Sequence, residues 1–105
     1  MRLIKFESDV IVRGSVIRFP AKWPYEDIVD FMVFDPLECD TGMGLIVSSG
    51  YKGGLISVIL PKESEIRRSI SAKWLKENWK KWVYPECSVD DVYVCEGYPV
   101  PDTLP

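Results

Sequence analysis

Only one stretch of this chain repeats its apolar side chains at helical spacing. Leu75, Trp79 and Trp82 recur three and four residues apart, and mostly lysines fill the positions around them. Serines shortly before this stretch can supply an N-terminal cap, and Tyr84-Pro85 ends it because the residue before a proline disfavours helix. We therefore predict one main helix over about residues 71–83, with Trp79 and Trp82 packed against the core.

The rest of the chain consists of short β-branched and aromatic runs separated by turn formers. We predict strands at residues 9–19, 31–34, 44–49, 55–60 and 92–95, and a further short strand is open at residues 3–6. Gly53-Gly54 favours a turn, so the runs on either side of it should form a β-hairpin. Pro24 and the acids after it favour one helical turn at residues 25–30.

Strands that precede a single helix, rather than alternate with helices, exclude a doubly wound parallel fold. The expected fold is α+β: an antiparallel or mixed sheet of about five strands with the main helix packed on one face. The 105 residues are a usual length for one domain. We expect residues 1–105 to form a single domain in which residues 97–105, with three prolines, are an irregular tail.

The sequence contains no histidine and has three cysteines, Cys39, Cys87 and Cys95. Without histidine, the commonest general base and the usual partner of a serine or cysteine nucleophile is missing. Three cysteines without a C-x-x-C pair suit free thiols in a reducing compartment better than a zinc site or a disulfide framework. We therefore expect no catalytic residues, no metal and no cofactor.

The first residues, Met1 to Glu7, lack the apolar run of a signal peptide, and no stretch is long and apolar enough to span a membrane. These features predict a cytoplasmic protein without a membrane partner. The net charge of −3 argues against a nucleic-acid partner, because a phosphate backbone is bound by a broad basic surface. The lysines beside Trp74 on the predicted helix do not outweigh that balance.

Carboxylates are concentrated between residues 26 and 40, with aromatic residues nearby. The candidate partner-binding residues are Trp23, Tyr25, Glu26, Asp27, Asp30, Asp35, Glu38, Asp40 and Tyr51. The carboxylates form either a solvated acidic edge or a negative patch that docks on a basic partner, and exposed Trp and Tyr side chains often anchor interfaces. The glycine-rich residues 50–54 read first as a hairpin turn, because they lack the P-loop pattern.

Three stretches of the sequence carry a family resemblance. They are Lys22-Trp23-Pro24-Tyr25-Glu26-Asp27, the run from Gly44 to Gly54, and Trp74-Leu75-Lys76-Glu77-Asn78-Trp79-Lys80-Lys81-Trp82. Through them the chain resembles, over nearly its whole length, the immunity protein 45 family of bacterial polymorphic toxin systems. The resemblance implies a cytoplasmic α+β protein that binds and neutralises a cognate toxin domain. It transfers no catalytic residues and identifies no toxin chemistry.

Three hypotheses about function remain. The first is a toxin-neutralising immunity protein, whose acidic patch orients the toxin and whose anchors are Trp23, Tyr25 or Tyr51. The second is a small enzyme or ligand-binding domain that uses the acidic cluster or the glycine-rich turn, and it requires a concave pocket lined by those groups. The third is a homo-oligomeric structural module, such as a homodimer, assembled through Trp74 or Trp23.

Overall fold

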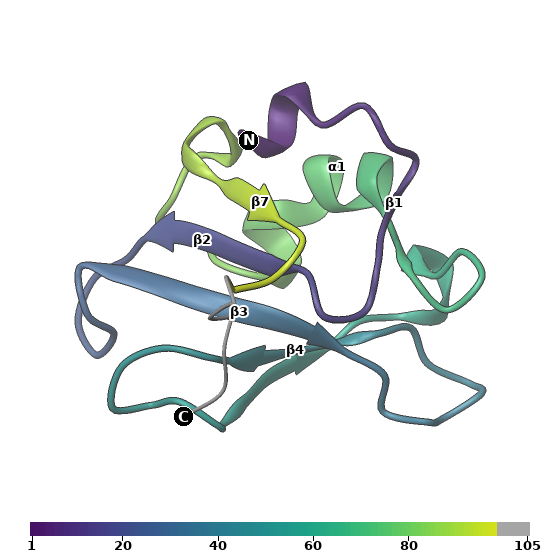
Figure 1. The fold of residues 1–105 in the computed structure, drawn as a ribbon, viewed down its shortest axis with the longest axis horizontal. Helices are drawn as coiled ribbons and strands as arrows, with labels where there is room; N and C mark the ends of the chain where they lie inside the picture. Colours follow the sequence, from purple (N-terminus) through teal and green to yellow (C-terminus); the bar gives the residue numbers. More distant parts are fainter. Residues whose placement is uncertain (99–105) are drawn as a thin grey trace, which may run out of the picture.

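The computed structural model describes residues 1–98 and shows a five-stranded antiparallel sheet, a two-stranded sheet and one α-helix (Figure 1). In spatial order the large sheet contains β5 (Ile56–Ile59), β4 (Gly44–Val47), β3 (Ile28–Phe34), β2 (Val16–Pro20) and β7 (Tyr93–Cys95). The small sheet pairs β1 (Val10–Ile11) with β6 (Ile70–Ser71), and three 3-10 helices cover Leu3–Lys5, Lys62–Ser64 and Val89–Asp91. The predicted α+β class is confirmed.

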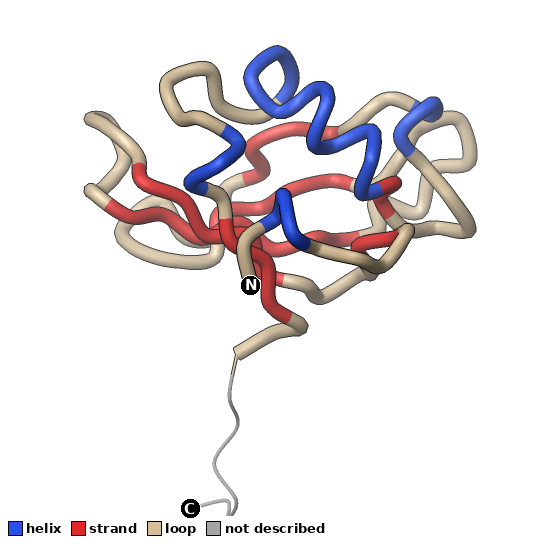
Figure 2. The backbone as a smooth tube through the Cα atoms, turned by 90° about the horizontal axis from the view of Figure 1, so that it is seen from above, coloured by secondary structure: helices blue, strands red, loops and turns tan. Residues whose placement is uncertain are grey.

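The α-helix, α1 (Ala72–Trp82), matches its prediction to within one residue at each end. The Ser71 hydroxyl caps it by accepting a hydrogen bond from the amide of Trp74 at 3.2 Å. Figure 2 shows α1 on one side of the strands of the large sheet. Leu75 and Trp79 are buried beneath it, and the Trp79 ring packs edge-on against Phe19 with ring centres 4.9 Å apart.

Strand register sorts the side chains of the large sheet into two faces, because directly opposite residues share a face. The core face points toward α1 and carries cross-strand pairs such as Ile17 with Phe31 and Val33 with Leu45. The opposite face, which we name the open face, carries the alternate residues. They are Val16, Arg18, Pro20, Ile28, Asp30, Met32, Phe34, Gly44, Ile46, Ile56, Ile59, Tyr93 and Cys95.

The single strand predicted at residues 9–19 is wrong. The chain turns between β1 and β2, where Ser15 donates its amide to the carbonyl of Val12 at 3.1 Å and Gly14 has a φ of +88°. A positive φ is easily adopted by glycine alone, so the residue that suggested a bulge marks a change of sheet. β1 therefore pairs with β6, and β2 pairs with β3 and β7.

The helical turn predicted at residues 25–30 is also wrong, because β3 already begins at Ile28. Val29 and Asp30 lie opposite Phe19 and Arg18 of β2, and this long-range pairing outweighs the local preference of the preceding acids. Residues 3–5 form a 3-10 helix instead of the short strand that was open at 3–6. The predicted hairpin is confirmed as β4 and β5, and the last strand falls at residues 93–95.

Three further expectations concern the chain as a whole. Residues 99–105, most of the predicted irregular tail, lie outside the described residues. Cys39, Cys87 and Cys95 are free thiols, of which Cys87 is buried. Within residues 1–98, no helix has both the length and the apolar character required to cross a membrane.

Candidate protein-binding surface

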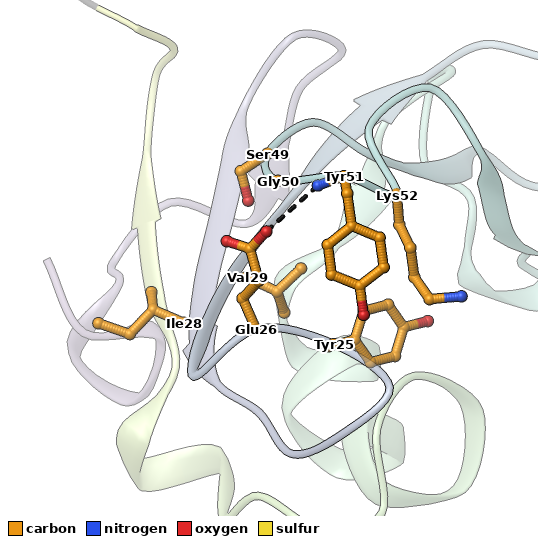
Figure 3. A pocket seen from close by; sticks show the side chains of 8 residues that line it. All are labelled: Tyr25, Glu26, Ile28, Val29, Ser49, Gly50, Tyr51 and Lys52. Carbon is orange, nitrogen blue, oxygen red and sulfur yellow. Dashed lines mark hydrogen bonds between the residues drawn. The ribbon is translucent and has the colours of Figure 1, made fainter.

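Two loops meet at one end of the large sheet. Because β3 and β4 are antiparallel, the loop of residues 21–27 before β3 lies beside the loop of residues 48–55 after β4 (Figure 3). The amide of Tyr51 donates to Oε1 of Glu26 at 3.2 Å, and the Tyr51 hydroxyl donates to the carbonyl of Pro24. We name this surface the two-loop end.

The two-loop end exposes large apolar side chains. Trp23 is 89% exposed and Tyr51 is 68% exposed, whereas Ile28, 60% exposed, points away from the other side chains shown in Figure 3. Tyr25 behaves differently from these residues. It is half-buried, its ring centre is 6.1 Å from those of Phe31 and Tyr84, and the ammonium of Lys52 lies 5.8 Å from the ring. Tyr25 therefore supports the loop from inside.

The hollow between these two loops is small. It has a volume of about 10 Å³ and is lined by Tyr25, Glu26, Ile28, Val29, Ser49, Gly50, Tyr51 and Lys52. Small-molecule sites usually enclose roughly 300 Å³ or more. The hollow between the two loops is therefore too small to enclose a small-molecule substrate.

The six candidate carboxylates are distributed along β3 and beyond both of its ends. Glu26 and Asp27 are exposed at the two-loop end, Asp30 is buried on the open face, and Asp35 follows the other end of β3. Glu38 and Asp40 are exposed in the loop beyond Asp35. Within residues 1–98, no three His, Cys, Asp or Glu side chains gather where they could hold a metal ion.

Asp30 lies in a polar cluster at the middle of the open face. Arg18 donates to both of its carboxylate oxygens, at 2.7 and 2.9 Å, and the Tyr98 hydroxyl donates to Oδ2 at 2.7 Å. Ser48 Oγ lies 2.9 Å from the same hydroxyl and is its donor, since the tyrosine hydrogen is given to Asp30. We name Arg18, Asp30, Ser48 and Tyr98 the polar centre.

Hydrogen bonding fixes the charge states of the polar centre. The hydrogen bond from Arg18 lowers the pKa of Asp30, although burial of the carboxyl opposes that change. The same bond raises the pKa of Arg18. Burial is the main cause of the raised pKa of Tyr98. At neutral pH the cluster is therefore an ion pair with a neutral tyrosine as a second donor to the carboxylate.

Sequence reasoning selected Asp30 but missed its three partners. Arg18 and Asp30 are 12 residues apart, and Tyr98 is 68 residues from Asp30, so no local pattern links them. The available signal was Arg18 itself, a charged residue inside a run of apolar strand residues. An ion pair across two adjacent strands is a common way to place such a charge.

Asp35 is held within a second ion-pair cluster. Arg68 Nη2 donates to its Oδ1 at 2.7 Å, and the amide of Leu37 donates to the same oxygen at 2.7 Å. The Arg68 hydrogen bond is the main cause of the lowered pKa of Asp35. Leu37, Arg67 and Arg68 all have positive φ, at 62°, 49° and 54°. Asp35 thus fixes the loop after β3 to the turn before β6.

The larger hollows on the surface do not gather the candidate residues. One of about 420 Å³ lies between residues 6–9 and the start of α1, and none of the candidate partner-binding residues lines it. Its charged groups are of both signs, including Glu7, Asp9, Arg67, Lys73 and Lys76. Trp74, the other candidate contact of a homo-oligomer, is half-buried and its ring centre lies 6.0 Å from that of Trp82.

Comparison with known proteins gives one match. A family model described as Immunity protein 45 matches residues 3–94 of the chain. No curated protein and no solved structure matches significantly. The matched segment begins at the first 3-10 helix and ends within β7, so it includes both sheets, α1 and the two-loop end.

Proposed function

The chain belongs to the Immunity protein 45 family, and on that premise we propose that it binds a cognate bacterial toxin domain in the cytoplasm and neutralises it by direct contact. The family match over residues 3–94 carries this proposal. In this role the protein covers the active site of the toxin or holds the toxin in an inactive conformation. It needs no catalytic residues of its own.

The two-loop end supports this proposal as a contact surface. Trp and Tyr are frequent hot spots of interfaces, and Trp23 and Tyr51 are both largely exposed there. The bonds from Tyr51 to Glu26 and Pro24 hold the two loops together before a partner arrives. Loops that are already ordered lose less conformational entropy on binding, which favours affinity.

Charge at the same end supplies orientation. Asp27 and Glu26 are exposed beside Trp23, and acidic groups at the rim of an interface accelerate association with a basic partner. Asp35, Glu38 and Asp40 form a second acidic region at the far end of β3, about 23 Å away for a seven-residue strand. A toxin domain of ordinary size can contact both regions. Asp30 lies between them and takes part by holding the side chain of Arg18 in place.

A growth experiment tests the proposed function. The candidate toxin is the C-terminal domain of a large secreted protein encoded beside this chain, expressed in bacteria with and without the chain. The expected result is arrested growth with the domain alone and restored growth with both, together with a one-to-one complex by light scattering. Unrestored growth and the absence of a complex would refute the proposal for that pair.

A variant comparison then assigns the surface. Replacing Trp23 and Tyr51 by alanine together is expected to weaken the complex at least tenfold, measured by calorimetry. Lys81→Ala, an exposed change on α1 on the other side of the sheet, serves as the matched control and should alter affinity less than twofold. Equal affinities for the two variants would show that the two-loop end is not part of the contact surface.

A further inference from the structure

The open face of the large sheet is an apolar surface with a charged residue at its middle. Ile28 and Ile56 are each 60% exposed, Tyr93 and Tyr98 are exposed, and Met32, Phe34, Ile46 and Ile59 are half-buried. Phe34 and Ile59 occupy the space above Gly44, which has no side chain of its own, so the surface continues without a gap from β3 to β5. The core face of the same strands is buried under α1.

Arg18 stands in this face with free donor capacity. Its Nε and Nη2 bond to Asp30, while Nη1 has no hydrogen-bond partner within residues 1–98. The Arg18 side chain is 57% exposed, whereas that of Asp30 is 3% exposed. Asp30 therefore anchors the guanidinium from below and leaves its outer edge accessible. Arginine held in this way favours a carboxylate as its next partner.

We propose that the open face is part of the toxin-docking surface and that Arg18 receives a carboxylate of the toxin domain there, a proposal that rests on the function proposed above. The open face adjoins the two-loop end, because Ile28 begins β3 directly after the first loop and Leu55 and Ile56 continue the second loop into β5. The chemistry of the partner surface is an apolar patch that carries at least one Asp, Glu or chain-terminal carboxylate.

The size of the open face supports a combined surface. Five strands spaced by about 4.8 Å, each roughly 10–23 Å long, give a footprint of roughly 400 Å². A stable interface usually takes about 800 Å² from each partner. The open face therefore supplies about half of the area of such an interface. The neighbouring two-loop end, with Trp23 and Tyr51, can supply the rest of the area.

The composition of the combined surface also fits a protein partner. Arg, Tyr and Trp are the side chains most often found as hot spots, and here Arg18 and Tyr98 lie at the centre with aliphatic side chains around them. A surrounding apolar ring excludes water and strengthens a central ion pair. The alternative occupant of an apolar sheet face is a second copy of this chain, which the test below separates from the toxin.

The test uses the intact chain and the candidate toxin domain from the growth experiment. Five single variants are compared by calorimetry. Three change the open face: Arg18→Ala, Arg18→Lys and Ile56→Ser. The other two, Arg13→Ala and Val12→Ser, lie in the turn before β2 and are the matched controls. We expect Arg18→Ala and Ile56→Ser to weaken binding at least tenfold, Arg18→Lys to lie between them and the native chain, and both controls to stay within twofold.

Folding of each variant is checked by its thermal unfolding midpoint. Ile56→Ser keeps the proposal falsifiable if Arg18→Ala unfolds, because an exposed side chain contributes little to stability. If Arg18→Ala and Ile56→Ser bind with native affinity while the native chain still restores growth, the open face is not part of the docking surface. That outcome would leave the proposed function intact. A failure of the native chain to bind the domain would instead refute the proposed function.

Light scattering of the isolated chain completes the design. The proposal expects a monomer at micromolar concentration, with the open face free until the toxin domain arrives. A dimer that Ile56→Ser converts to monomers would assign the face to a second copy and overturn the proposal.

Discussion

At the scale of single residues, Asp30 combines burial with three charged or polar contacts. It accepts hydrogen bonds from Arg18 and Tyr98, and its amide donates to Ser49 Oγ at 2.9 Å. A buried carboxylate that keeps its charge stabilises the folded state only while it is ionised. The stability of the protein should therefore respond to pH through this residue.

The first prediction concerns that response. Because the pKa of Asp30 is lowered on folding, its contribution is present above the unfolded value of about 3.9 and is lost as the pH falls through the folded value. Asp30→Asn should lower the free energy of unfolding at pH 7 by about 1–2 kcal/mol, a range kept small because Arg18 is half exposed and screened by solvent. Urea unfolding at pH 7, 5 and 3.5 measures both effects.

Asp27→Asn is the control, since Asp27 is exposed and has no side-chain hydrogen bond within residues 1–98. Its unfolding free energy should stay within about 0.5 kcal/mol of the native value at each pH. A native pH profile in Asp30→Asn would show that the ion pair on the open face does not contribute to folding.

Trp79 gives a second prediction. Its side chain is buried, and its indole Nε1 has no hydrogen-bond partner within residues 1–98. Trp79→Phe removes an unsatisfied donor and keeps most of the packing on Phe19, so it should cost about 1–2 kcal/mol, against about 3–5 kcal/mol for Trp79→Ala. Guanidinium unfolding of the two variants provides the comparison, and equal losses would contradict the claim that a phenyl ring keeps most of the packing on Phe19.

At the scale of elements, the turn before β6 contains two of the three non-glycine residues within residues 1–98 that have positive φ. Ile66 and Ser69 exchange both backbone hydrogen bonds, and Arg67 and Arg68 between them have positive φ. Such two-residue turns usually contain Asn or Gly. Arg68 is retained by its contacts with Asp35 and with the carbonyl of Thr41, whereas Arg67 is exposed.

The third prediction follows from this difference. Arg67→Gly should raise the free energy of unfolding by about 0.5–1 kcal/mol, because glycine adopts positive φ without the steric cost of a Cβ. Arg67→Ala removes the same side chain but keeps the Cβ, so it should not stabilise the protein. Thermal unfolding followed by circular dichroism distinguishes the two, and a matching gain in both variants would assign the effect to lost charge.

The elements that sequence reasoning located are those whose signals are local. The stripe of Leu75, Trp79 and Trp82 predicts α1, and Gly53-Gly54 predicts the turn between β4 and β5. The elements that it misplaced depend on pairing. Residues 28–30 join β3 because they lie opposite β2, and β1 separates from β2 because β6, some 60 residues later, is its partner.

The candidate site divides in the same way. Exposure of Trp23 and Tyr51 at one end follows from loops that proline and glycine mark in the sequence. The different environments of the six carboxylates cannot be read from the sequence in this way. Asp30 and Asp35 are each held by an arginine from another element of the fold. Ser48 and Tyr98 can be recognised as partners of Arg18 and Asp30 only once β2, β3, β4 and β7 are placed in one sheet.

At the scale of the whole molecule, net charge −3 is combined with acidic groups that project from the two-loop end. Long-range attraction acts on the rate of association and weakens as salt screens it, with a Debye length of about 10 Å at 0.1 M. The effect of a surface charge on binding should therefore depend on ionic strength.

The fourth prediction is that Asp27→Lys slows association with the candidate toxin domain about three- to tenfold at low salt and less than twofold at 0.5 M salt. Stopped-flow fluorescence of Trp23 provides the signal, since that side chain is largely exposed before binding. Lys81→Glu on α1 changes the net charge in the opposite sense from the other side of the sheet, and comparison with it separates local from overall charge. An association rate independent of salt in the native chain would contradict electrostatic steering.

The two faces of the large sheet have different roles: one forms the core, and the other faces outward. Side chains packed under α1 determine whether the chain folds, while Ile28, Ile56 and Arg18 project away from that core. Mutations of exposed apolar residues on the outward side, such as Ile28 and Ile56, can accumulate at small cost in folding free energy, whereas Arg18 is constrained by the buried Asp30. Under the proposed function, substitutions on the outward side would let the contact surface adapt to a changed toxin domain while the folded core stays the same.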